Sequence, residues 1–226
     1  MSWEAATLAT ELAGLLWEMG KTVSGSAGVS FGGAPYKILT SLTTIEIFEE
    51  QGKPQWTEFV QDRIVEFRKE QSPPHFTYYT QGEAYIDELI VARKSESFDY
   101  QDSKKVYCRR RDIRFNKGDQ VEMTLRAHSV DGFPGSDEWF ELEVEERVEE
   151  LRFVIIFPDN NPPRGEVVLH YRPPKARHDA WVIPKFEKYG TRYTTRNRRA
   201  FYWETRKPRV GSAYKIKWTW LKKLKN

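Results

Sequence analysis

The segment from Lys185 to Arg209 interleaves basic side chains with aromatic ones. Basic groups hold phosphates and aromatic rings stack on bases, which is how many proteins bind single-stranded nucleic acid. An ordinary sheet with rings inward and charges outward gives the same alternation, so both interpretations stay open. The candidate residues for binding a nucleic acid or an acidic partner are Lys185, Lys188, Arg192, Arg196, Arg198, Arg199, Arg206 and Lys207.

The residue types that usually perform catalysis or bind metals form no recognisable constellation. Four histidines are present and no two are spaced i,i+4; they are His75, His128, His170 and His178. A single cysteine, Cys108, excludes the thiolate zinc patterns. The string from Ser24 to Gly28 has a serine where a nucleophile elbow needs its first glycine. We therefore expect a non-enzymatic protein with no metal site and no cofactor.

The N-terminal residues 3–19 have the periodicity of an amphipathic helix, with Ser2 as a cap and Gly20 as a terminator. Such a helix either packs on its own domain or docks on a partner. The docking residues would be Leu8, Leu12, Leu15 and Leu16.

Residues 23–35 are rich in Gly, Ser and Ala, a composition typical of a linker. They do not form a phosphate-binding loop, because no lysine follows their glycines in the order that such a loop needs.

The remaining pattern predicts one more helix and many strands. Trp56, Phe59, Val60, Ile64 and Phe67 follow helical spacing, so a second helix is expected over 55–70. Alternation and apolar runs predict strands near 42–49, 75–80, 106–115, 120–128, 139–147, 151–157, 165–171, 180–183, 191–195, 199–205 and 213–220. Residues 83–94 fit either a helix or a strand, and a strand is favoured near 89–92. The expected fold class is α+β and mainly β. Residues 1–100 would form a small helix-containing N-terminal α+β region, and residues 101–226 an antiparallel β-sandwich, with the option that the two share one core.

The net charge of +3 hides an uneven distribution along the chain. From Arg172 to Asn226 there are 17 Lys and Arg against 3 Asp and Glu, a balance of +14. The rest holds 19 basic and 30 acidic residues, a balance of −11. Either the basic part attracts phosphates or an acidic partner, or the two parts neutralise each other within one fold.

The stretch from about Tyr107 to Trp220 resembles a β-rich domain found at the C-terminal end of diverse bacterial regulatory and conflict-system proteins. The residues that carry the resemblance are Leu151–Pro158, Phe201–Glu204, Pro208–Gly211 and Tyr214–Trp220. The resemblance implies an immunoglobulin-like sensing or docking module, often joined to a helix-turn-helix, NTPase or effector part. It transfers no functional residue to this chain.

The compartment and partners follow from these features. One cysteine allows no intramolecular disulfide, the N-terminus carries acids where a signal peptide has basic residues, and no apolar run of about 20 residues is present. We expect a cytoplasmic protein without a membrane partner. The expected function is a protein-interaction or sensor module of a bacterial signalling or defence system that binds another protein. The alternative is a nucleic-acid-binding β domain that uses the segment 185–209.

Overall fold

The computed structural model describes residues 35–50, 53–74, 76–79, 83–92, 94–95, 105–108, 113–185, 188–194 and 197–221. Within these ranges the chain forms thirteen strands and no helix. The strands are β1 Tyr36–Phe48, β2 Trp56–Phe67, β3 Phe76–Tyr79, β4 Glu83–Val91, β5 Lys94–Ser95, β6 Lys105–Cys108, β7 Gln120–Val130, β8 Asp137–Glu143, β9 Val148–Ile156, β10 Val168–Arg172, β11 Lys188–Tyr193, β12 Arg199–Arg206 and β13 Ala213–Thr219. The helix predicted over 3–19 lies outside the described residues.

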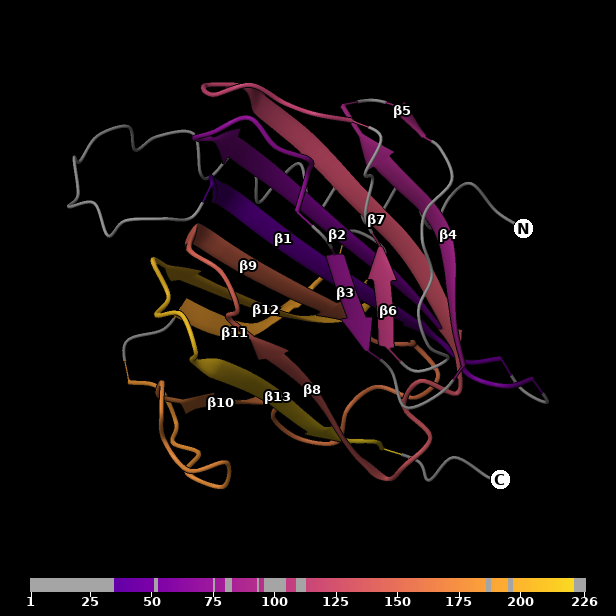
Figure 1. The fold of residues 1–226 in the computed structure, drawn as a ribbon. Helices are drawn as coiled ribbons and strands as arrows, with labels where there is room; N and C mark the ends of the chain where they lie inside the picture. The colour runs from indigo at the N-terminus through magenta and orange to yellow at the C-terminus, as the bar shows by residue number, and fades with distance from the viewer. Residues whose placement is uncertain are drawn as a thin grey trace.

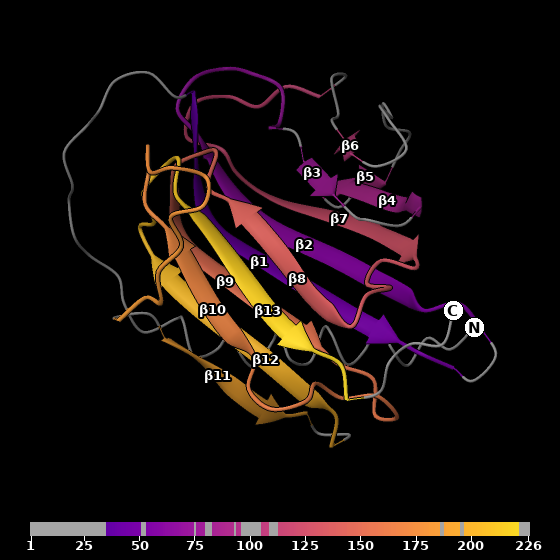
Figure 2. The ribbon, with the colours of Figure 1, turned by 90° about the horizontal axis from the view of Figure 1, so that it is seen from below.

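The strands form three sheets (Figure 1). The large sheet has eight strands in the order β11-β12-β9-β1-β2-β7-β4-β5, a second sheet has the order β10-β13-β8, and β3 pairs with β6. Neighbours in the large sheet are antiparallel except β1 and β9, which run parallel with Ile45 opposite Ile155. The three-stranded sheet lies against one face of the large sheet (Figure 2). We call this the inner face and the opposite one the outer face.

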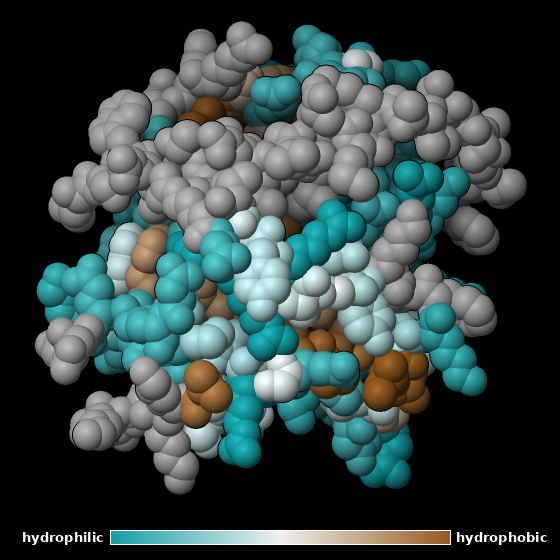
Figure 3. All heavy atoms as spheres, turned by 180° about the vertical axis from the view of Figure 1, so that it is seen from behind, coloured by the Kyte–Doolittle hydropathy of each residue, from teal (hydrophilic) through white to brown (hydrophobic). Residues whose placement is uncertain are grey.

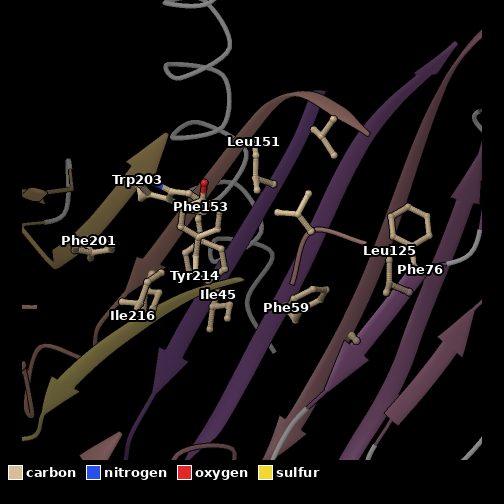
Figure 4. Packing of buried hydrophobic residues seen from close by; sticks show 14 of the residues in the cluster. Ile45, Phe59, Phe76, Leu125, Leu151, Phe153, Phe201, Trp203, Tyr214 and Ile216 are labelled. Carbon is tan, nitrogen blue, oxygen red and sulfur yellow. The ribbon is translucent and has the colours of Figure 1, made fainter. Parts of the chain in front are cut away.

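Side chains from both sheets fill one hydrophobic core between the layers (Figure 4). Trp203 of β12 is 1% exposed, and its ring centroid lies 4.2 Å from that of Tyr214 on β13. The labelled core residues are Ile45, Phe59, Phe76, Leu125, Leu151, Phe153, Phe201, Trp203, Tyr214 and Ile216. Because large rings bury much apolar area each, this core stabilises the fold although the chain is rich in charge.

The alternation of apolar and polar residues along a strand predicts which of its side chains are buried and which are exposed. In β7 the residues Val121, Met123, Leu125 and Ala127 are buried and those between them are more exposed, which confirms the strand predicted over 120–128. In β9 every residue from Leu151 to Ile156 is buried. That pattern, with the position of β9 between β12 and β1, confirms the central buried strand that the apolar run predicted.

The helix predicted over 55–70 is wrong, because residues Trp56–Phe67 form strand β2. The inner face of β2 buries Phe59, Val65 and Phe67, while Val60 and Ile64 are half-buried on the outer face. When both faces of a strand carry apolar side chains, the mixture of odd and even positions imitates the i,i+3,i+4 spacing of a helix. Hydrogen bonding to β1 and β7 on either side decides in favour of the strand.

The β-rich character of the chain extends through both halves of the sequence. Strands from residues 36–95 and from 120–206 are neighbours in the large sheet, and they contribute to the same core. Among the described residues, no helix is long and apolar enough to span a lipid bilayer.

Candidate functional site

The arginines at the start of β12 are engaged inside the protein. Arg198 donates through Nη1 to Glu46, through Nη2 to the carbonyl of Ile47 at 2.9 Å, and through Nε to the carbonyl of Phe157 at 3.1 Å. Its side chain is 11% exposed. Arg199 donates to the carbonyls of Pro163, at 2.8 Å, and Gly165. Both guanidinium groups therefore hold loops to the sheet.

The other candidates of this segment differ in their contacts and exposure. Arg192 lies over the ring of Tyr202 at 4.2 Å, and Lys207 Nζ lies 3.8 Å from Glu149 Oε2. Arg206 and Lys185 are exposed. Lys188 belongs to β11 but its side chain is not among those described, and Arg196 lies outside the described residues. The docking residues Leu8, Leu12, Leu15 and Leu16 also lie outside them.

A different group of basic and aromatic side chains converges on the outward side of the three-stranded sheet. Antiparallel pairing places Lys215 of β13 between His170 of β10 and Glu141 of β8, and Lys217 opposite Trp139. The bridge between Tyr171 and Val182 brings the following loop, with Trp181, to the edge of β10. We call this surface the aromatic–basic face; it comprises Trp139, Glu141, His170, Arg172, Trp181, Lys215 and Lys217.

The centre of the aromatic–basic face is a lysine enclosed by two tryptophans. Lys215 Nζ lies 4.7 Å from the ring centroid of Trp139 and 4.2 Å from that of Trp181. It also lies 3.1 Å from Glu141 Oε2, and Arg172 Nη2 lies 3.6 Å from the other oxygen of that carboxylate. Cation–π and ionic contacts of this kind fix the orientation of both rings. Two cations share one carboxylate here, which leaves positive charge in excess.

The electrostatic field at this face is positive. Burial, and then the charges of Lys217 and Lys215, lower the pKa of His170. Lys217 is exposed. The same charges that disfavour a protonated imidazole attract a carboxylate or phosphate from solution.

Large apolar side chains reach the surface beside these charges. Trp139 is 38% exposed, Val182 51% and Ile183 59%. Elsewhere, on the side opposite to the view of Figure 1, described apolar side chains form small separate areas among hydrophilic ones (Figure 3). Exposed large apolar groups that lie together make this face a candidate interaction surface.

A row of ionisable side chains crosses the outer face of the large sheet. Strand pairing aligns Glu46, Glu58, His128 and Tyr85. His128 Nδ1 lies 2.7 Å from Asp87 Oδ1. Burial, and then the charge of Asp87, raise the pKa of Glu58. Such a row could transfer protons, but ion-pair networks with a purely structural role shift carboxyl pKa values in the same way. We therefore interpret this row as structural.

The sequence contained part of the signal for the aromatic–basic face. The alternation of β13 already directs Lys215 and Lys217 away from the core, opposite to Tyr214 and Ile216. What the sequence does not contain is the pairing of β13 with β8 and β10, and only that pairing places Trp139 and His170 beside these lysines.

The described residues contain no group of three or more His, Cys, Asp or Glu side chains arranged to hold a metal ion.

No protein-family model matches this chain, and neither does any curated protein. Several solved structures match part of this chain. Their sequence identities to it are so low that the similarity concerns the fold alone.

A putative protease from Parabacteroides distasonis is 9% identical with a TM-score of 0.50, over 82% of this chain and 40% of the other. An M1 zinc metallopeptidase from Deinococcus radiodurans is 8% identical with a TM-score of 0.48, over 83% of this chain and 43% of the other. A putative nutrient binding protein from Legionella pneumophila is 12% identical with a TM-score of 0.48, over 81% of this chain and 67% of the other. This chain thus spans less than half the length of the peptidases it matches.

Proposed function

We propose that this protein is a non-enzymatic interaction module that binds another protein through the aromatic–basic face. The partner presents carboxylates beside apolar side chains. The observation that carries the proposal is the enclosed Lys215, with Trp139 held on one side of it and exposed over 38% of its surface. The resemblance noted from the sequence would place such a module in a bacterial signalling or defence system.

The proposed binding energy comes from two sources. Trp139, Val182 and Ile183 offer apolar area whose burial favours association. Lys217 and the positive field that acts on His170 favour an acidic segment over a basic one. Because Lys215, Arg172 and Glu141 already orient the tryptophans, little side-chain freedom is lost on binding.

Nucleic acid is the second class of partner, and two arginines of the segment 185–209 are poorly placed to bind it. Arg198 and Arg199 donate their guanidinium groups to the protein itself. A nucleic acid could still meet the rings and lysines of the aromatic–basic face, so it is treated as an outcome of the experiment below.

Site-specific photo-crosslinking in the source cell tests the proposal. A benzophenone amino acid replaces Trp139 in one variant and Tyr193, which is 69% exposed on edge strand β11, in the matched control. We expect one defined protein adduct from position 139 and none of that mass from position 193. Equal adducts from both positions, or none, would refute the proposal, and crosslinking of nucleic acid from position 139 would replace it with the second class.

Purified components then separate the two energetic contributions. A Trp at the centre of an interface typically contributes about 2 kcal/mol or more, so Trp139→Ala should weaken binding roughly 30-fold. Lys217→Glu should also weaken binding, and the loss should grow as the salt concentration is lowered, because the new carboxylate repels the carboxylates of the partner. Arg206→Glu, on the outer face of the large sheet, should leave the affinity unchanged.

A further inference from the structure

The outer face of the large sheet carries an apolar cluster of its own. Leu42 of β1, Val154 and Ile156 of β9, and Ala200 of β12 form it, and each is at most 5% exposed. No residue of the three-stranded sheet belongs to this cluster among the described residues, since that sheet packs on the inner face. We propose that residues 3–19 of this same chain pack on the outer face as an amphipathic helix and cover the cluster.

The dimensions of the cluster match a single helix. Strand pairing puts Ile156 between Ala200 and Glu46, and Val154 opposite Thr44, so the cluster spans three adjacent strands. Strands lie about 4.8 Å apart, which makes the apolar strip about 10 Å wide. A helix with its side chains is about 10 Å in diameter.

The pattern of residues 3–19 provides the complementary surface. Leu8, Leu12, Leu15 and Leu16 recur at helical spacing on one side. Seventeen residues of helix are about 25 Å long. That length covers roughly seven or eight residues of an underlying strand, at about 3.3 Å each.

The connection between the segment and the sheet has the required reach. Residues 20–34 separate the segment from Pro35, and Tyr36 begins β1 in the middle of the large sheet. Thr44 lies eight residues further along β1, about 26 Å away. Fifteen glycine-rich residues have a typical end-to-end distance of about 20 Å and extend to about 50 Å.

Cysteine accessibility in the full chain tests this placement. In a Cys108→Ser background, Ala200→Cys places one thiol within the cluster, and Lys217→Cys places a matched thiol on the aromatic–basic face. We expect the thiol at 200 to react with a thiol reagent at least about tenfold more slowly than the one at 217. Leu12→Asp with Leu15→Asp should accelerate the reaction at 200 and leave that at 217 unchanged, which also shows that the sheet remains folded.

The alternative outcomes are distinct. Rapid reaction at 200 in the intact chain, or slow reaction that the two aspartates do not change, would overturn the proposal. If the protection of the thiol at 200 disappears on dilution, a second copy of the chain covers the cluster, and the proposal is overturned as well. A second measurement is independent of reaction rates: Leu12→Cys with Ala200→Cys should form an intramolecular disulfide on mild oxidation, and Glu11→Cys with Ala200→Cys should form far less.

Discussion

Replacing Arg198 with methionine removes a cation that links strand β1 to the residue just after β9. Its guanidinium group donates to Glu46 on β1, to the carbonyl of Ile47 at 2.9 Å and to the carbonyl of Phe157 at 3.1 Å. The Glu46 side chain is 2% exposed and that of Arg198 is 11% exposed. The substitution removes a cation that contacts this carboxylate inside the protein.

The expected loss of stability follows from that burial. Removing one partner of a buried ion pair costs about 3–5 kcal/mol, because the remaining charge is desolvated without compensation. For a chain of this size each kcal/mol corresponds to roughly 2–4 °C in Tm. Arg198→Met should therefore lower Tm by roughly 6–20 °C. Removing both charges, in Arg198→Met with Glu46→Met, should restore most of the loss, since apolar replacement of a whole buried pair is often close to neutral.

Urea unfolding followed by tryptophan fluorescence measures the free energy of unfolding for the two single variants and the double variant. Arg206→Met on the same strand is the control, and because Arg206 is exposed its effect should stay within about 0.5 kcal/mol. A loss below about 1 kcal/mol for Arg198→Met, or a double variant whose loss equals the sum of the two single losses, would refute the reasoning. A drop in nucleic-acid affinity at unchanged stability would instead return Arg198 to the role expected from the sequence.

Three further perturbations test the core, the outer face and a turn. Trp203→Ala empties a site that is 1% exposed and should cost about 3–5 kcal/mol in urea unfolding. Burial and Asp87 raise the pKa of Glu58 above its value in the unfolded chain, so the folded state binds the proton more tightly and is penalised above the folded pKa. Glu58→Gln should therefore stabilise the protein at neutral pH, and thermal unfolding over a pH series should show this gain shrinking as the pH falls. Gly211 has a φ of +82°, and a Cβ there meets Pro174 only at 3.6 Å, an ordinary contact. Gly211→Ala should then cost about 1–2 kcal/mol from backbone conformation alone, and Gly211→Asn less, by the same unfolding measurement.

The strands with one buried face were predictable from the sequence. Alternation in β7 and β13 shows both the strand and the direction of each side chain, because successive side chains of a strand point to opposite faces. The apolar run of β9 indicated a central buried strand. For strand β2 the same reasoning wrongly predicted a helix, because Phe59 on its inner face and Val60 on its outer face together imitate a helical period.

The residues that we propose for binding were predictable only by type. Density of arginine in 185–209 indicated a cationic surface, yet Arg198 is held by Glu46 on β1 and Arg199 by a loop carbonyl. Side-chain charge is visible in a sequence, but the partner that neutralises it is distant along the chain. The aromatic–basic face was missed for the same reason, because Trp139 and Lys215 belong to strands that are far apart in sequence.

The sequence by itself determined the β-rich character of this protein, the inward and outward sides of its regular strands, and the excess of positive charge toward its C-terminus. Those properties depend on neighbouring residues and on composition. The tertiary structure alone decided that β1 lies parallel to β9, that β2 is a strand, and which cations are paired within the protein and which are exposed. Each of these depends on pairing between distant segments, where the free energy of packing and of ion pairing exceeds the local preference of the chain.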